Sequence, residues 1–291
     1  MEQILPGVWL VKAENKGRFP FAHSLFLEGD PNLLIDTGAG SGLAPLSGRV
    51  ELVLLSHYHR DHVMGNHLFA DAAFKIHPLD APGVQSLEGF LELSGLGRFC
   101  GADYWKLVRQ SGFTATSLAG SIEDGMRFDL GTMTVQVLHT PGHTPGHCAF
   151  LIEEYETVFA ADIDLTSFGP WYGNPTSDPA SFLKSIQRLR SLKPALLLTS
   201  HSSPVRDGLD RCLAGYAAVI QQREEKLYQA LTGGPKTLEQ LIDLKLIYGR
   251  HPYPEHLFRF FEGNMIEKHL QLMLQKARIC VQDSGRLYEA L

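Results

Sequence analysis

The sequence is poor in cysteine, and the few cysteines it has are far apart. There are only four, Cys100, Cys148, Cys212 and Cys280. Cysteines this dispersed provide neither a metal-ligand motif nor a disulfide framework. We therefore expect a chain that folds without disulfides in a reducing compartment, the cytoplasm.

Long apolar runs and an excess of positive charge are also missing. No stretch approaches the ~20 apolar residues that a membrane span requires. Residues 1–6 lack the basic region and the apolar core of a signal peptide. The formal net charge is −6, so no overall positive field attracts nucleic acid or an anionic membrane. We expect neither of them as a partner.

What remains is the composition of an ordinary globular protein. The 291 residues are 44% hydrophobic and 20% charged, and no disordered tail is evident. This length suits one large domain and one small one. Because the composition changes after Pro204, we predict domains at residues 1–205 and 206–291.

Three histidines and an aspartate crowd into residues 56–62. This segment directly follows residues 51–55, a short apolar run typical of a buried strand. A chain that leaves a sheet at the carboxyl end of a strand often places its chemistry there. Histidine and aspartate are the usual ligands of zinc and similar divalent ions. The segment therefore predicts a metal-binding cluster, formed by His57, His59, Asp61 and His62.

The same arrangement, a strand followed by a residue with metal-binding or metal-supporting chemistry, recurs at four other places. These residues are Asp36, His143, Asp162 and His201. Two Pro-Gly pairs fix tight turns around His143. Together the five instances predict a single site, assembled at one edge of a sheet system. Asp164 is a weaker candidate than Asp162, because Asp162 follows its apolar run directly.

These motifs resemble the metallo-β-lactamase superfamily, whose hallmark is a His-x-His-x-Asp-His box followed by single His, Asp and His ligands. The Leu-Ile-Asp-Thr-Gly and Thr-Pro-Gly-His-Thr stretches are also typical of it, and the match covers roughly residues 7–205. The resemblance implies an αββα sandwich, two mixed sheets packed face to face with helices outside. Within the superfamily we expect a glyoxalase II-like or lactamase-like branch.

The resemblance also implies two divalent metal ions, zinc in the first place, with iron or manganese as alternatives. Its ligand sets are His57, His59 and His143 for the first ion, Asp61, His62 and His201 for the second, and Asp162 as the bridge. Asp36 would hydrogen-bond near the first-metal histidines rather than bind metal. Two departures from the family pattern are small replacements, Ala161 where Gly is common and Ser56 where Thr is common.

An aromatic, turn-rich stretch at residues 168–175 follows Asp162. Trp171 and Tyr172 are candidates to line the substrate pocket, with Tyr172 donating a hydrogen bond to a substrate oxygen. Simple packing is the alternative for both. Residues 103–109 could form an amphipathic helix, either a plain cover for the sheet or a part of the substrate mouth or of a dimer contact.

The last third of the sequence reads as helical. Asp178 and Pro179 give a strong helix start, with the helix running through Ser191. We expect further helices at residues 207–231, 237–248 and 262–276, then two short strands at residues 278–281 and 286–288 around a turn at residues 283–285.

Helices followed by a hairpin resemble a winged helix, an appendage of several superfamily members. Residues 234–291 contain eight basic and seven acidic side chains, so no concentrated basic face for phosphate binding is visible. We expect a packing or dimerisation module, hence a homodimer, and a structural role for His269.

The leading prediction is hydrolysis of a small-molecule ester, thioester or lactone by a metal-bridging hydroxide. Asp61 and Asp162 would partly offset the charge of the two cations. The alternatives are a non-haem iron oxidoreductase or dioxygenase and an endoribonuclease. Diiron oxidoreductases of the family usually carry Glu at the position of His59, and this disfavours that variant.

Overall fold

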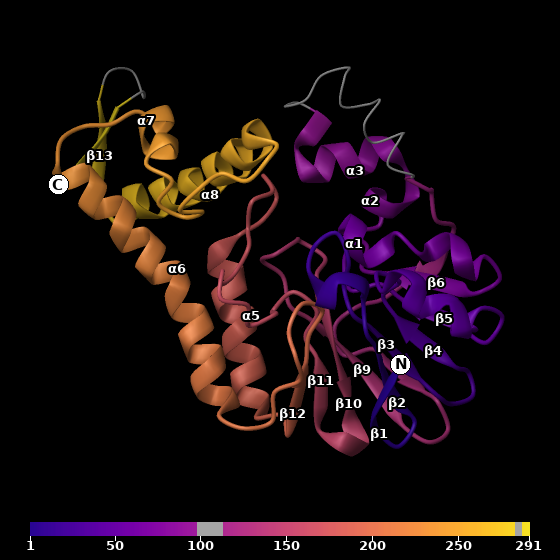
Figure 1. The fold of residues 1–291 in the computed structure, drawn as a ribbon. Helices are drawn as coiled ribbons and strands as arrows, with labels where there is room; N and C mark the ends of the chain where they lie inside the picture. Colours follow the sequence, from indigo (N-terminus) through magenta and orange to yellow (C-terminus); the bar gives the residue numbers. More distant parts are fainter. Residues whose placement is uncertain (98–112, 283–286) are drawn as a thin grey trace.

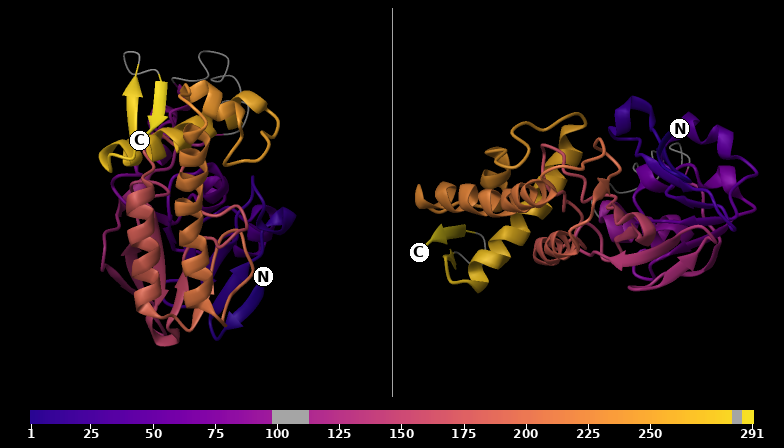
Figure 2. Two further views of the ribbon diagram at one scale, coloured as in Figure 1. Left: turned by 90° about the vertical axis from the view of Figure 1, so that its left-hand side faces the viewer. Right: turned by 90° about the horizontal axis from the view of Figure 1, so that it is seen from below.

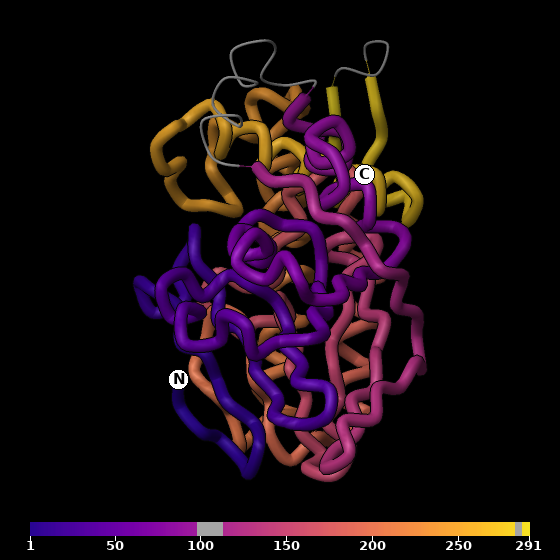
Figure 3. Tube along the Cα trace, turned by 90° about the vertical axis from the view of Figure 1, so that its right-hand side faces the viewer, coloured from indigo at the N-terminus to yellow at the C-terminus, as the bar shows by residue number. Residues whose placement is uncertain are grey.

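Two β-sheets packed face to face, with helices on the outside, form the main body of the protein (Figure 1). The structure is a computed structural model that describes residues 1–97, 113–282 and 287–291. The predicted αββα sandwich is confirmed. Seen from the side, the indigo and purple strands of the first half lie beside the pink strands of the second half (Figure 3).

The first sheet has seven strands in sequence order. Its first four strands pair antiparallel and the following ones pair parallel, so the ends of the fourth and fifth strands meet at one edge. The strands are β1 (Glu2–Leu5), β2 (Val8–Val11), β3 (Ser24–Leu27), β4 (Leu33–Ile35), β5 (Leu52–Leu54), β6 (Ala73–Ile76) and β7 (Leu118–Ser121).

The second sheet has five strands in the order β12-β11-β10-β9-β8. The strands are β8 (Arg127–Asp129), β9 (Thr134–His139), β10 (Cys148–Ile152), β11 (Thr157–Phe159) and β12 (Leu196–Leu198). Only the pair β11–β12 is parallel. Branched and aromatic side chains of both sheets, among them Leu27, Ile35 and Phe150, fill the space between them, because the hydrophobic effect drives both inner faces together.

Helices cover the outer faces of the sandwich and also lie beside it. They are α1 (Arg60–Val63), α2 (Pro82–Gln85), α3 (Leu87–Ser94), α5 (Pro179–Leu192), α6 (Leu209–Thr232), α7 (Leu238–Asp243) and α8 (Glu255–Gln275). Short 3₁₀ turns are η1 (Glu14–Gly17), η2 (Gly40–Leu46), η3 (Asn66–Phe69) and η4 (Glu153–Tyr155). Helices α5 and α6 pack on the outer face of the second sheet, while η2, η3 and α2 cover the first.

The start of α5 agrees with its sequence signal. The Asp178 side chain accepts hydrogen bonds from the backbone N–H groups of Ala180 and Ser181, and Pro179 occupies the first turn. Helix α8 begins at Glu255, seven residues before the predicted start. Helix α7 ends at Asp243, well before the predicted Tyr248, because Lys245 adopts a positive φ of 52° and the chain turns there.

The C-terminal elements have a hydrophobic cluster of their own. Strands β13 (Ile279–Gln282) and β14 (Leu287–Ala290) form the predicted antiparallel hairpin, which packs with α6, α7 and α8 beside the sandwich (Figure 2). The first half of α6 packs in the cluster of the second sheet and its second half in the C-terminal cluster. The domain boundary at 205/206 and the winged-helix resemblance stay predictions.

Some predictions fall on residues that the structure does not describe. They are the helix expected at residues 103–109, the turn at residues 283–285 and Cys100. The other three cysteines, Cys148, Cys212 and Cys280, are free. Within the described ranges, no helix combines the length and the apolar character needed to cross a membrane.

Candidate metal centre

The predicted metal ligands meet at one edge of the sandwich. The box follows β5, and His143, Asp162 and His201 follow β9, β11 and β12. Ligand-type atoms gather there in two groups, each with its atoms within 4.8 Å of one another. The first ligand group is His57, His59, His143 and Asp162, and the second ligand group is Asp61, His62 and His201.

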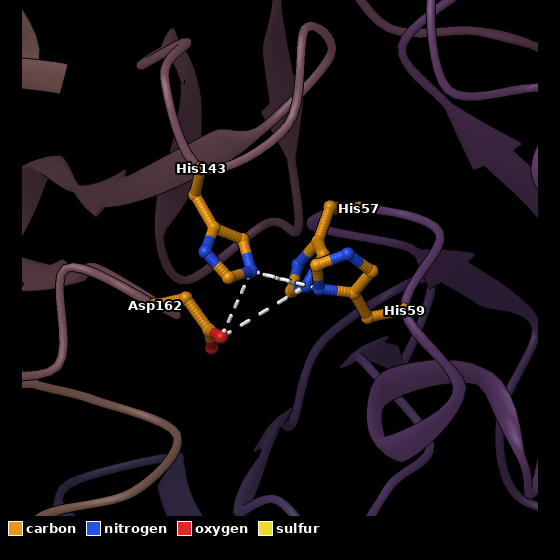
Figure 4. A group of neighbouring side chains, drawn as sticks. All are labelled: His57, His59, His143 and Asp162. Carbon is orange, nitrogen blue, oxygen red and sulfur yellow. Dashed lines mark hydrogen bonds and ion pairs between the residues drawn. The ribbon is translucent and has the colours of Figure 1, made fainter. Parts of the chain in front are cut away.

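In the first ligand group, three imidazoles and a carboxylate converge (Figure 4). The Nε2 atom of His143 lies 2.8 Å from Nδ1 of His59 and 3.2 Å from Nε2 of His57. It also lies 3.1 Å from Oδ2 of Asp162. Three ring nitrogens and a carboxylate oxygen around one point form a suitable donor set for a divalent ion.

The second ligand group adjoins the first through Asp162. Oδ1 of Asp162 lies 3.0 Å from Nε2 of His62 and 3.4 Å from Nε2 of His201. The His201 nitrogen is also 3.5 Å from Oδ2 of Asp61. Asp162 therefore turns one oxygen to each group, which is the arrangement of a bridging carboxylate.

Two atoms in the centre are buried without a hydrogen bond, and both are potential ligands. They are Nε2 of His62 and Oδ1 of Asp162. Although they lie 3.0 Å apart, the angles do not make a hydrogen bond. Leaving a buried polar atom unsatisfied costs about 1–3 kcal/mol, and a cation beside both atoms would remove this cost. The residues present therefore fit a metal site.

The surroundings of the imidazoles fix their tautomers. Nδ1 of His143 lies 2.9 Å from the carbonyl of Trp171, and Nδ1 of His201 lies 2.6 Å from that of Gly17. A carbonyl only accepts, so each Nδ1 carries the proton and each neutral ring keeps its Nε2 lone pair for a ligand.

The charge state differs among the rings of the centre. Burial, followed by the neighbouring histidines, holds the pKa of His57 and of His59 well below the ordinary value, so these rings are neutral. Burial would lower the pKa of His62 and of His201, but Asp162 outweighs it, which holds the pKa of His62 well above the ordinary value and raises that of His201 to about 9. Burial would raise the pKa of Asp162, but His62, His201 and His143 outweigh it and hold that pKa well below the usual range. Because metal binds neutral imidazoles and ionised carboxylates, a cation would displace the protons of His62 and His201.

Asp36 supports the centre through hydrogen bonds to His62 and Ser56. Its Oδ2 accepts hydrogen bonds from Nδ1 of His62 (2.8 Å) and from the Ser56 hydroxyl (2.7 Å), and its Oδ1 accepts from the Ser56 N–H. Asp36 thus contacts a histidine of the second ligand group, and reaches His57 only through Ser56, whose hydroxyl lies 2.9 Å from Nδ1 of His57. Asp36 therefore hydrogen-bonds near His57, as expected, and its direct contact with His62 adds to that expectation.

The role predicted for Tyr172 is wrong. This side chain is fully buried, and its hydroxyl lies 2.8 Å from Nε2 of His269 in α8. It points toward the C-terminal helices, so the packing alternative describes this side chain. The adjacent Trp171 is half-buried, with its ring 5.6 Å from those of His59 and His143. Asp164 lies outside both ligand groups and accepts a hydrogen bond from Tyr216.

Sequence reasoning missed Asn174 as a supporting residue. Its buried side-chain amide lies 2.6 Å from Nε2 of His59 and 2.7 Å from the Tyr58 hydroxyl. The amide nitrogen makes both contacts, so it links the His59 ring to Tyr58 and fixes the orientation of that ring. The residue lies in a turn of mixed composition, and nothing in the local pattern signals this contact.

Sequence reasoning also missed a buried carboxylate that joins the box to the turn carrying His143. Asp80 accepts hydrogen bonds from the Thr144 hydroxyl (2.6 Å) and from the N–H groups of Gly146 (2.7 Å) and Tyr58 (3.3 Å). Burial raises the pKa of Asp80 to about 6 against these hydrogen bonds. A Cβ atom at Gly146 would lie 2.7 Å from this carboxylate, so only glycine fits there.

Comparisons with known proteins agree with the geometry. The model of the metallo-beta-lactamase superfamily matches residues 18–201. An atrochrysone carboxyl ACP thioesterase from Claviceps purpurea is 27% identical over 246 residues, which is 79% of this chain and 67% of that protein. The chain spans 46% to 67% of the length of three curated relatives that it matches.

Solved structures show the same fold. A metallo-beta-lactamase family protein from Thermus thermophilus superposes with a TM-score of 0.77 at 25% identity, covering 99% of this chain and 100% of that one. A protein named TTHA1623, solved in a di-iron-bound form, has a TM-score of 0.50 at 30% identity, covering 65% of this chain and 92% of that one. With strand-end ligands, sandwich and matched segment in agreement, this chain belongs to the metallo-β-lactamase superfamily.

Proposed function

We propose that this protein is a metal-dependent hydrolase that cleaves an ester, thioester or lactone with two divalent ions. The observation that carries the proposal is the pair of adjoining ligand groups that share Asp162, with a buried, unpartnered oxygen and nitrogen at their junction. Hydrolases and thioesterases among the relatives support the reaction class.

The chain's own residues would hold the two ions. His57, His59 and His143 would bind the first, Asp61, His62 and His201 the second, and Asp162 both. When bound, the ions supply Lewis-acid polarisation of a carbonyl and a water that loses its proton near neutral pH. Asp61 and Asp162 would offset part of the four positive charges. Asp36 and Ser56 would keep His62 and His57 in the tautomers that bind metal, and Asn174 would orient the ring of His59.

The bond type is the open part of the proposal, and thioesters are the first to test. The Claviceps purpurea relative is an acyl carrier protein thioesterase by name, and 79% of this chain aligns with it. Zinc is our first choice of metal. Iron is the alternative that one observation favours, because the related TTHA1623 structure is di-iron-bound, and iron would open the route to oxygen chemistry on the same ligands.

The experiment combines elemental analysis with a substrate panel. Protein purified without added metal should contain about two divalent ions per chain. It should hydrolyse at least one of a thioester, a lactone and a carboxylic ester, lose this activity on chelation and regain it with zinc(II). Full hydrolysis by metal-free protein would contradict the proposal. Iron content with oxygen consumption would support the oxidoreductase instead.

A further inference from the structure

The segment at residues 168–174, called the aromatic loop from here on, is held by the C-terminal elements along its length. In Figure 1 the chain just before α5 rises to the end of α8. Helix α6, the α7–α8 connection and helix α8 each contribute side chains that contact the loop. The partner residues in these contacts belong to the C-terminal elements and not to the strands of the sandwich.

Arg223 of α6 makes the strongest of these contacts. It is 3% exposed, and its guanidinium donates to the carbonyls of Phe168 and Pro170, both at 2.5 Å. It also lies over the rings of Phe168 and Tyr172, 4.6 Å and 5.4 Å from their centroids. Among the described residues no carboxylate forms an ion pair with it. Burying a cation costs free energy unless the cation is hydrogen-bonded. The two loop carbonyls therefore stabilise the buried Arg223, and Arg223 in turn satisfies both carbonyls.

Three more side chains from the C-terminal elements hold the aromatic loop. Together with Arg223 they are called the clamp. The Tyr248 hydroxyl accepts a hydrogen bond from the Trp171 indole N–H at 2.7 Å. The Asn264 amide donates to the Gly173 carbonyl at 2.7 Å, and His269 is 2.8 Å from the Tyr172 hydroxyl. Five of the seven residues of the aromatic loop thus have a hydrogen-bond partner in residues 209–291.

Two glycines allow the close approach that these hydrogen bonds require. A Cβ atom at Gly169 would lie 2.6 Å from a methyl group of Val219 in α6, and Gly169 has a positive φ of 82°. A Cβ atom at Gly173 would lie 3.0 Å from the Cβ atom of Phe261 in α8. The loop is therefore packed tightly against both helices, with little freedom to shift.

The other side of the aromatic loop supports the first ligand group alone. The Trp171 carbonyl fixes the ring of His143, and the Asn174 amide contacts the ring of His59. Within the described residues, the loop makes no hydrogen bond to Asp61, His62 or His201. The clamp residues are therefore connected through the loop to the first ligand group and not to the second.

We propose that residues 209–291 set the metal affinity of the first ligand group by clamping the aromatic loop, with Arg223 and Tyr248 as positioning residues. This inference rests on the proposed metal site. It assigns the C-terminal helices a role in the metal centre in addition to the packing or dimerisation role predicted from sequence. Loss of partners that orient metal ligands lowers metal affinity by about 10–100-fold.

The test compares Tyr248→Phe with the matched control Tyr228→Phe. Both remove one hydroxyl from the C-terminal elements, but the Tyr228 hydroxyl donates only to the Leu291 carbonyl, away from the loop. Metal-free protein is titrated with zinc(II) against a chromophoric chelator, and thermal unfolding of the metal-free chains is recorded alongside. We expect Tyr248→Phe to weaken one of two zinc ions by up to about tenfold and Tyr228→Phe to weaken neither.

Arg223→Met should weaken the same zinc ion by about 10–100-fold, and cobalt(II) spectra should change for that ion only. If this variant does not fold, Tyr248→Phe decides the question. Unchanged affinity for both ions in the loop-contacting variants, or equal weakening of both, would overturn the clamp. A wild-type chain that binds no zinc(II) would instead overturn the proposed metal site, so the two failures are distinguishable.

Discussion

The two ligand groups adjoin each other, yet most of their supporting contacts come from different parts of the chain. In the second ligand group, Asp36 fixes His62 and the Gly17 carbonyl fixes His201. In the first ligand group, Ser56 contacts His57, but the Trp171 carbonyl fixes His143 and the Asn174 amide contacts His59. The second group thus depends on residues near the start of the sequence, and the first depends mainly on a loop near its middle.

The two ligand groups differ in what positions their supporting residues. A β-sheet does so for the second group, and contacts with the C-terminal helices do so for the first. Asp36 directly follows β4, which pairs with β5, the strand that leads into the box. Its position is therefore given by the ladder of the first sheet. Trp171 and Asn174 lie in a loop without regular structure, which needs the helices α6 and α8 to hold its shape. Substitutions at four positions test this difference between the two ligand groups.

The largest effect is expected for Asp162→Ala, because this side chain serves both groups. We expect bound metal to fall from about two ions to well below one, and turnover to fall to the background rate. Elemental analysis and the hydrolysis assay measure the two effects. His67→Ala is the control, since His67 is exposed and its ring lies 3.0 Å from the Met64 carbonyl, just after α1 and outside both ligand groups. A variant that keeps two ions would show that Asp162 does not bridge.

Asp36→Ala should weaken the second ligand group. It removes the acceptor for the His62 ring and leaves the buried Ser56 N–H without a partner. We expect about 10–100-fold lower affinity for one zinc ion, and about 1–3 kcal/mol lower free energy of unfolding in the metal-free chain. The exposed Asp71→Ala is the control in the same zinc titration. Cobalt(II) spectra should identify a different ion from the one that Arg223→Met disturbs.

Asn174→Leu should weaken the first ligand group, while Asn174→Asp should largely spare it. Leucine offers no polar atom to Nε2 of His59, whereas a carboxylate oxygen can accept the Nε2 proton when Nδ1 binds a metal ion. We expect about 10–100-fold lower zinc affinity for the leucine variant, measured by chelator competition. Equal losses in both variants would mean that Asn174 acts by packing alone.

The last prediction concerns the stability of the fold rather than metal affinity, and it rests on Asp80, which joins the box to the turn carrying His143. Its pKa is raised to about 6 by burial, so the folded chain binds the proton more tightly than the unfolded chain does. Asp80 therefore makes unfolding harder as the pH falls through 6 toward the ordinary aspartate pKa, and this gain is absent at higher pH. Relative to Asp80→Asn, metal-free wild type should gain about 3 kcal/mol over that window. Denaturant unfolding at several pH values measures it. A difference independent of pH would contradict the raised pKa.

The sequence predicted the regular elements of the sandwich well where its signals are local. Apolar runs before Asp36, His57 and Asp162 correspond to β4, β5 and β11, and Asp178 caps α5 as its pattern indicates. The strand β1 was not predicted, because its residues 2–5 are exposed or half-buried and lack a clear alternation. The bounds of α7 and α8 were also wrong, since the buried Glu262 side chain accepts a hydrogen bond from the Ile247 N–H, a contact between segments that no local pattern indicates.

The positions of histidine and aspartate after apolar runs in the sequence were enough to predict which side chains gather at the centre. Each of the seven predicted ligands follows a strand, and a strand's direction and end are encoded by neighbouring residues. The contacts that orient these ligand side chains could be identified only from the tertiary structure. Gly17 and His201 are 184 positions apart, and the contacts of Arg223, Tyr248 and Asn174 likewise cross between elements. Such contacts depend on how packed elements meet, and for this reason Tyr172 faces the helix α8 rather than the metal centre.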